Sequence, residues 1–458
     1  MFSITVRDFG PIAKGEVQLR PLTIFIGPNN AGKSYFALLI YSLLHTLLPI
    51  GRFHFSPLRF AKFRFSDKME KQFNKWIKSK NYKDKEEISY KDIPYDLLVL
   101  IDEYIKESSK SFEDGIKRCF TCDIHSLIRH GSTQGININI NNSNPPYLYF
   151  EFKSNTNDHF QGKYKYDLED LTINYHKDIY RFFLNILQKI MRDLPSSLYY
   201  LPAARSGILQ SHKALASIIV SRSPFAGIEP MEIPTLSGVV ADFISNLLQI
   251  GPVGFMEEKN KEILSIASLL EKDISHGEII LQPHETKFGY PEILYKIQGE
   301  SIPLQRTSSM ISELAPIILY LRYFIQKDNL LIIEEPEAHL HPDNQRILAL
   351  CIVKLIRAGV RIIITTHSDY FIQQISNFIK LGAKTQYLHH LKYKENDFLK
   401  EEEVGAYLFK HSKKLGGSTV EKLNVTSENG IPDDEFARIA EQLYNETVKI
   451  DYPTEITK

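Results

Sequence analysis

The stretch GPNNAGKS, residues 27–34, decides the fold class of this 458-residue chain. It matches the pattern G-x-x-x-x-G-K-[ST] and lies between two apolar runs, PLTIFIG and KSYFALLIYSLLHTLL, so a buried strand, a loop and a core helix follow one another. Such a loop turns backbone N–H groups toward phosphate oxygens, which Gly27 and Gly32 permit because they lack a Cβ. We therefore expect ATP to bind at Gly27, Pro28, Asn29, Asn30, Ala31, Gly32, Lys33 and Ser34.

Two of these loop residues have a more specific predicted chemistry. The Lys33 amine is placed to neutralise the β- and γ-phosphates, and the Ser34 hydroxyl is placed to ligate Mg²⁺. ATP and Mg²⁺ are therefore the expected cofactors.

Acidic residues follow a second apolar strand, LLIIEE at residues 330–335. Carboxylates at the C-terminal edge of a parallel strand lie where ligands bind in such sheets. Glu334 can reach Mg²⁺ through water, and Glu335 can polarise the attacking water; the alternative is an ordinary solvated strand end. A third apolar run, VRIIIT, precedes His367, which favours a γ-phosphate sensor over a structural histidine.

The remaining pattern indicates an α/β fold. The two apolar strands, with a helix expected at residues 342–358 between them, have the βαβ rhythm of a parallel sheet. Alternating runs such as YLYFEFKS indicate a small antiparallel sheet. We predict a discontinuous head with a mixed sheet at residues 1–50, 136–204 and 277–410, a helical basic insertion at 51–135, a helical insertion at 205–276, and a C-terminal tail with a short helix at 411–458.

Four segments resemble a known family: VRDFGPI, LTIFIGPNNAGKS, LLIIEEPEAHLHP and IIITTHS. They resemble the ABC-type ATPase heads of SMC- and RecF-like proteins, and most closely the OLD-type ATPases; the segment GIPDDEFARIAEQLYNE is also similar to that group. The resemblance covers both ends of the chain well and the middle poorly. It implies that Glu334 is the Walker B acid, Glu335 the catalytic glutamate, residues 338–341 the D-loop and His367 the switch histidine.

In that family two heads enclose two nucleotides, and a signature serine of one subunit caps the γ-phosphate bound to the other. The best match here is TSSMISE at residues 307–313, which makes Ser308 the signature serine just before a helix. Met310 stands where the family usually has Gly, and a side chain at a close backbone approach is expected to loosen the dimer and slow hydrolysis. The resemblance thus implies a homodimer or higher oligomer.

Three further residues of interest are less well defined. No sequence pattern identifies the Q-loop glutamine; Gln161 and Gln210 are the candidates. Arg205 in LPAARSG is either a charge near the nucleotide or the dimer seam, or an ordinary surface arginine.

Composition limits the classes of function. Lys+Arg and Asp+Glu both number 55, so no global basic field indicates a nucleic-acid or membrane partner. The longest apolar stretch, residues 34–50, includes Ser42, His45 and Thr46 and is typical of a buried helix rather than a membrane span. The N-terminus lacks the pattern of a signal peptide, and three cysteines cannot form a disulfide framework, so we expect a cytoplasmic protein without a membrane contact.

Two local patterns have alternative interpretations. Cys119, Cys122, His125 and His130 have a spacing that suits Zn²⁺, but IKRCFTCDIHSLI is also typical of an amphipathic helix with buried thiols. The basic run at residues 52–85 is rich in aromatic residues and suits either nucleic acid or an ordinary solvated helix face.

We expect slow ATP hydrolysis that acts as a switch for assembly. The 91 residues after His367 have acids in charged runs rather than at the ends of apolar strands, so we expect no nuclease domain in this chain. The resemblance then implies an ATPase subunit that gates a nuclease effector in trans, as in two-gene antiphage systems of the Septu or PARIS type. The alternatives are a RecF-like DNA-binding repair ATPase and an ATP-locked scaffold; a transporter ATPase fits least.

Overall fold

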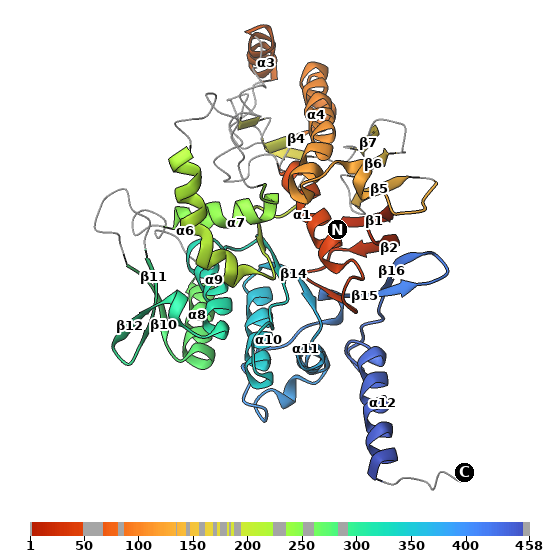
Figure 1. Cartoon of the computed structure of the whole chain (residues 1–458). Helices are drawn as coiled ribbons and strands as arrows, with labels where there is room; N and C mark the ends of the chain where they lie inside the picture. The colour runs from red at the N-terminus through yellow and green to blue at the C-terminus, as the bar shows by residue number, and fades with distance from the viewer. Residues whose placement is uncertain are drawn as a thin grey trace.

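The fold is seen in a computed structural model of the whole chain (Figure 1). The structure describes residues 2–48, 67–80, 87–133, 135–142, 147–154, 161–167, 172–174, 181–182, 185–186, 194–222, 235–250, 261–282 and 292–451.

One eleven-stranded sheet organises the molecule. Across the sheet the strands are β7 (Gln161–Asp167), β6 (Tyr147–Ser154), β5 (Ile136–Asn142), β1 (Phe2–Phe9), β2 (Ile12–Gln18), β16 (Gly417–Lys422), β15 (Val404–Ser412), β3 (Leu22–Ile26), β14 (Arg361–Thr366), β13 (Leu330–Glu334) and β9 (Leu198–Leu201). The five strands from β15 to β9 are parallel, and those from β7 to β2 are antiparallel. The prediction of an α/β fold with a mixed sheet is confirmed.

The central parallel strands are buried on both faces because their sequences are apolar without interruption, as in LTIFI and LLIIE. Successive side chains alternate between two hydrophobic cores. In β13, Leu330 and Ile332 belong to the first core, whereas Leu331 and Ile333 belong to the second. Helices must therefore cover both faces of the sheet.

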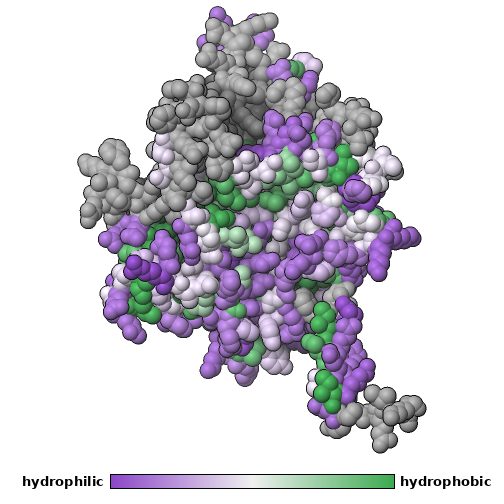
Figure 2. Space-filling model, viewed as in Figure 1, coloured by the Kyte–Doolittle hydropathy of each residue, from purple (hydrophilic) through white to green (hydrophobic). Residues whose placement is uncertain are grey.

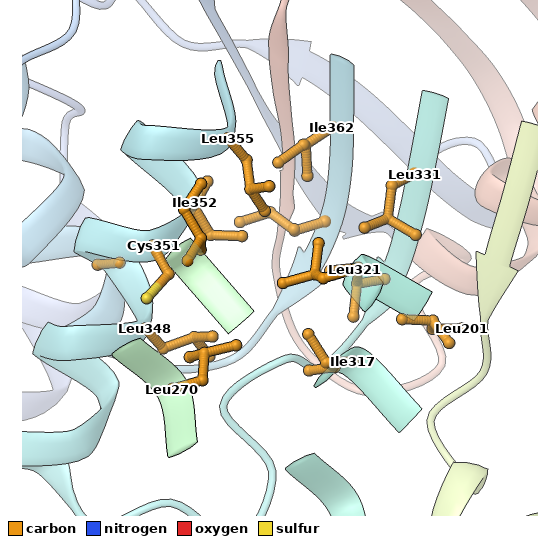
Figure 3. Close-up of a cluster of buried hydrophobic side chains, with 14 of the residues drawn as sticks. Leu201, Leu270, Ile317, Leu321, Leu331, Leu348, Cys351, Ile352, Leu355 and Ile362 are labelled. Atoms are coloured by element: carbon orange, nitrogen blue, oxygen red, sulfur yellow. The ribbon is translucent and has the colours of Figure 1, made fainter. Parts of the chain in front are cut away.

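The helices divide between these two cores. The first core contains α1 (Lys33–Leu47) and α4 (Tyr95–Phe120), and the second contains α8 (Lys261–Leu270), α9 (Ser309–Tyr323), α10 (Pro342–Arg357) and α11 (Asp369–Ala383). Figure 3 shows part of the second core, where side chains of α8, α9 and α10 meet those of β9, β13 and β14: Leu270, Ile317, Leu321, Leu348, Cys351, Ile352, Leu355, Leu201, Leu331 and Ile362.

The remaining described elements lie around this arrangement, and several of them add buried side chains to the two cores. The helices are α3 (Asp67–Lys80), α6 (Arg205–Arg222), α7 (Gly238–Gln249) and α12 (Asp434–Asp451), and the short helical turns are η1 (Tyr90–Asp92), η2 (Ile124–Leu127), η4 (Glu271–Ser275), η5 (Leu304–Arg306), η6 (Thr385–Tyr387) and η7 (Glu401–Glu403). A three-stranded sheet holds β10 (Glu278–Gln282), β11 (Glu292–Ile297) and β12 (Glu300–Pro303), and β4 (Glu87–Ser89) pairs with β8 (Thr172–Asn174).

Two segments differ from the sequence-based expectation. The alternating strands β5, β6 and β7 do not form a separate small sheet, because β5 pairs with β1 and extends the main sheet. Residues 404–422, which fall at the end of the expected head and the start of the expected tail, form β15 and β16. Because β15 pairs with β3, this late part of the chain lies directly beside the strand that precedes the GPNNAGKS loop.

The C-terminal helix α12 projects from the body of the molecule (Figure 1). Every residue from 437 to 451 is exposed, and apolar side chains form a band along the helix (Figure 2). The exposed large apolar residues on it are Ile439, Leu443, Tyr444, Val448 and Ile450. Among the described residues, no helix is long and apolar enough to cross a membrane.

Candidate nucleotide-binding site

The GPNNAGKS loop connects β3 to α1 through two glycines with positive φ, Gly27 at 141° and Gly32 at 96°. A Cβ on Gly27 would lie 2.3 Å from the carbonyl oxygen of Phe409 in β15, and a Cβ on Gly32 would lie 2.8 Å from Cγ1 of Ile12. Glycine is therefore required at both positions by backbone conformation and by close packing. The loop is held in one shape between β15 and the β1–β2 hairpin.

The Lys33 side chain folds over this loop. Its Nζ donates hydrogen bonds to the carbonyl oxygens of Gly27, at 2.8 Å, and Pro28, at 2.9 Å. Burial lowers the pKa of the Lys33 amine to about 8, although the carboxylates of Glu335, Glu337 and Glu334 oppose this shift. A buried ammonium group on a loop at a helix N-terminus suits a phosphate, and Ser34 at the exposed start of α1 adds a hydroxyl suited to Mg²⁺.

The Glu334 carboxylate lies at the end of β13 and is oriented by the neighbouring strand. The Tyr200 hydroxyl donates to its Oε1 at 2.7 Å, and the Ala203 N–H donates to its Oε2 at 3.0 Å. Glu334 is almost fully buried, so these two donors replace water around its charge. Both carboxylate oxygens are therefore held in place at the end of β13.

The next residue, Glu335, has a positive φ of 43°, which is uncommon for a side chain with a Cβ. Its N–H donates to the Thr365 carbonyl oxygen at 2.9 Å and thereby fixes the turn to the adjacent strand β14. Its carboxylate lies 3.4 Å from Nε2 of His367 and is partly exposed. The hydrogen bond from His367 lowers the pKa of Glu335 and keeps the carboxylate ionised, as a group that accepts a proton from water must be.

The backbone of His367 is positioned by Glu337. Its Oε1 accepts hydrogen bonds from the Thr366 hydroxyl at 2.5 Å and from the His367 N–H at 2.9 Å. Glu337 belongs to the turn between β13 and α10, next to residues 338–341, which the resemblance predicts to be the D-loop. The sequence did not single out Glu337 for this role, because its partners lie 29 and 30 residues further along the chain.

Arg205 is the most completely buried charged side chain of the site, with 0% exposure. Its guanidinium donates to the carbonyl oxygens of Glu334 at 2.8 Å, Glu335 at 3.2 Å and Glu313 at 3.0 Å. It also forms an ion pair with the Glu313 carboxylate at 3.1 Å. The alternative of a surface arginine is wrong: Arg205 joins α9 to the turn that carries Glu334 and Glu335.

Ser308 lies apart from the loop residues. It is the exposed N-cap of α9, and its side chain accepts a hydrogen bond from the Ile311 N–H at 3.4 Å. Since α9 belongs to the second core and α1 to the first, the two helices lie on opposite faces of the sheet. The Met310 sulfur contacts the Asn344 side chain of α10 at 3.4 Å, so this methionine packs against the helix that follows residues 338–341.

The structure places the remaining residues of interest away from these groups. Gln161 is in β7 at the far edge of the sheet, and Gln210 is an exposed residue of α6. Cys119 is buried at the end of α4, where desolvation raises the pKa of its thiol to about 12. In the part of the chain that the structure describes, no three His, Cys, Asp or Glu side chains are placed to hold a metal ion.

Only residues 67–80 of the basic run at 52–85 are described; the rest lies outside the described residues. Within α3, Phe73 is buried and packs against Phe182 with ring centroids 5.5 Å apart, and Trp76 packs against the same ring at 5.7 Å. Both aromatic residues are therefore held in packing contacts with Phe182.

Comparison with known proteins identifies the family model that matches. A model described as an AAA ATPase domain matches residues 1–372, which include every loop and strand-end residue described above. No curated protein matches the chain.

Several solved structures are similar to the chain. The SmcHead bound to the C-winged helix domain of ScpA is 12% identical, with 92% of this chain and 97% of that chain covered and a TM-score of 0.44. The SMC head domain from Thermotoga maritima is 9% identical, with 92% and 98% covered and a TM-score of 0.37. The Smc head domain from Pyrococcus furiosus, with an extended coiled coil and bound to the C-terminal domain of ScpA, is 13% identical, with 97% and 100% covered and a TM-score of 0.42.

Proposed function

The chain belongs to the AAA ATPase domain family, and from this premise we propose that it binds ATP with Mg²⁺, hydrolyses ATP slowly, and uses the bound state to assemble with a second copy and an effector protein. One observation carries the proposal. Lys33 and the Glu335–His367 pair follow strands β3, β13 and β14, which are neighbours and parallel, so the groups meet at one edge of the sheet.

Each residue has a defined part in the proposed reaction. The Lys33 ammonium group gives up its hydrogen bonds to the two loop carbonyl oxygens and binds phosphate oxygens instead. The backbone N–H groups of the loop hold the remaining phosphate charge. Ser34 holds Mg²⁺ directly, and Glu334 holds it through water. The bound ion neutralises phosphate charge. Glu335 orients the attacking water and accepts its proton, and His367 positions the Glu335 carboxylate and contacts the γ-phosphate.

The catalytic assignment is tested by phosphate release. Glu335→Gln keeps the size of the side chain and removes its proton-accepting charge, so hydrolysis should fall by about 10²-fold or more while ATP binding remains. Glu395→Gln, at an exposed position outside the site, is the matched control. Retention of the normal rate by Glu335→Gln would contradict the assignment.

Assembly through two heads is supported by the position of Ser308. Because α9 and α1 lie on opposite faces of the sheet and the Ser308 end of α9 is exposed, the serine is available to a nucleotide bound by another copy. The Met310 side chain occupies the first turn of the same helix. We attribute slow hydrolysis to this side chain, which holds the serine loosely against a partner's γ-phosphate.

An effector in trans is the partner that we propose, in keeping with an ATPase subunit of a two-gene antiphage system. Support comes from α12, whose apolar band is exposed along its described length. Most of the stability of a helix in a protein comes from packing of its apolar face, so a protein that covers the band would stabilise α12. Co-expression with the product of the neighbouring gene tests this partner directly: co-purification is expected, and its absence would remove the proposal.

A RecF-like DNA-binding ATPase is the second candidate, favoured by Lys71, Lys75 and Lys78, which are exposed on α3. It predicts ATP-dependent affinity for DNA that falls steeply with salt. Charge reversal at these three lysines should abolish that affinity, and DNA binding that persists in the triple variant would exclude α3 as the binding face.

A further inference from the structure

A cavity of about 400 Å³ lies between the C-terminal half of α11, the first turns of α10 and the segment around η6. Its volume falls in the range of ligand pockets in proteins. It is separate from the ATP site: α11 begins just after His367, and Lys380, on the cavity wall, is eleven residues further along the helix, about 16 Å at 1.5 Å per residue.

The wall of the cavity is positively charged. Arg346, Lys380 and Lys384 line it, and no aspartate or glutamate does. Within the described residues, none of these three cations forms an ion pair. Arg346 and Lys384 are exposed and Lys380 is half-buried, so the three cations are accessible to an anion, which this positive charge would attract.

Three of the lining residues form a hydrogen-bonded unit. The amide of Gln374, which is only 5% exposed, accepts from Nε of Arg346 at 3.1 Å and donates to the Tyr393 hydroxyl at 3.2 Å. This bond orients the guanidinium, whose two terminal nitrogens donate to no described residue. A guanidinium held in this way presents paired N–H groups, the geometry that matches phosphate oxygens.

Aromatic rings also line the cavity. Tyr387 and His390 both line it, with ring centroids 6.4 Å apart, and Tyr387 is half exposed. An exposed aromatic ring beside a cationic pocket offers a face on which a base can stack.

We propose that this cavity binds a nucleoside phosphate. The phosphate contacts Arg346, Lys380 and Lys384, and the base stacks on Tyr387. The same chemistry is presented by a free mononucleotide and by the 5′-phosphorylated end of an oligonucleotide. The site requires no ATP hydrolysis and is independent of the function proposed for the loop site.

Calorimetric titration tests the proposal with the loop site disabled by Lys33→Ala. The probes are AMP, a 5′-phosphorylated tetrathymidylate and inorganic phosphate. We expect AMP or the oligonucleotide to bind, and Lys380→Ala with Lys384→Ala to weaken binding by about tenfold or more, since a charged hydrogen bond contributes about 1.5–3 kcal/mol. Lys394→Ala, an exposed lysine outside the cavity, is the matched control and should bind normally.

The remaining outcomes show whether the ligand is a free nucleotide or a strand end, and whether the base contributes to binding. AMP alone identifies a free nucleotide as the ligand, and oligonucleotide alone identifies a strand end. Tyr387→Ala should weaken both nucleotide probes but not inorganic phosphate. In the wild-type protein, the same probes should protect residues 384–391 from hydrogen exchange, which checks the result without Lys33→Ala. Binding that is absent, or unchanged in the double lysine variant, would overturn the proposal.

Discussion

The fully buried guanidinium of Arg205 donates a hydrogen bond to the main-chain carbonyl oxygen of Glu334 at 2.8 Å. The same group pairs with the Glu313 carboxylate of α9. One side chain therefore connects the helix that begins at Ser308 with the turn that presents the carboxylates of the ATP site. A shift of α9 on assembly would be transmitted to Glu335 through this connection.

Replacing Arg205 should affect both stability and catalysis. Arg205→Ala leaves Glu313 buried and unpaired, which costs about 3–5 kcal/mol of unfolding free energy. Arg205→Lys keeps the charge but not the fork of donors, so it should fold with a lower kcat. Thermal unfolding and phosphate release measure the two effects, and Arg7→Ala, at an exposed position in β1, is the control. A normal kcat in a folded Arg205→Lys protein would contradict the connection.

The pH profile should report Lys33. Because the pKa of this amine in the free protein is lowered to about 8, it loses its proton as the pH rises through that value. Phosphate binding requires the ammonium form, so kcat/KM for ATP should fall above pH 8. In Lys33→Arg the side chain stays charged, so kcat/KM should not fall above pH 8, even if its activity is lower. A kcat/KM that is constant from pH 7.5 to about 9.5 would contradict the assigned role.

The same shift has a consequence for stability. The unfolded chain holds a Lys proton up to about pH 10.4, whereas the folded protein releases it near pH 8, so the unfolded state binds more protons between these values. Burial of this group therefore opposes folding most below about pH 8, and this cost is relieved as the pH rises from about 8 to about 10.4. ATP should reverse this effect of Lys33 on stability, since bound phosphate stabilises the ammonium form of its side chain. Denaturation with and without ATP at pH 7 and pH 9.5 measures the difference.

Restoring glycine at position 310 should accelerate hydrolysis. Met310→Gly removes the side chain that contacts Asn344 and allows a second copy to approach the backbone more closely. Met310→Ala also removes the contact with Asn344, but its Cβ still prevents the closer backbone approach. Comparing the two variants shows whether the lost contact or the closer approach changes the rate of hydrolysis. If Met310→Gly still hydrolyses ATP slowly, the Met310 side chain is not the cause of slow hydrolysis.

Charge on the apolar band of α12 should release the effector and leave ATP hydrolysis intact. Ile439→Glu with Leu443→Glu places two carboxylates on the exposed band. Arg438→Glu lowers the charge by the same amount on the opposite side of the same helix and is the control. Co-purification measures retention of the partner, and a partner that stays bound to the double glutamate variant would exclude the band as its docking surface.

The loop and the strand ends could be predicted because their signals are local. GPNNAGKS has its own sequence pattern, and β13 and β14 are continuous apolar runs that end in polar residues. β15 was hard to predict because it follows a charged segment and its pairing with β3 joins residues almost 400 positions apart. Arg205 and Glu337 depend in the same way on contacts between distant segments, and burial of a charged residue contradicts its usual preference.

Native mass of Glu335→Gln with ATP and Mg²⁺, alone and after co-expression with the neighbouring gene product, tests the central claim most directly. Removing the proton acceptor should trap the ATP-bound state, so we predict a dimer or higher oligomer that retains the neighbour's product. Without nucleotide the mass should fall. A protein that remains a monomer in saturating ATP and retains nothing would contradict an ATPase that acts through assembly.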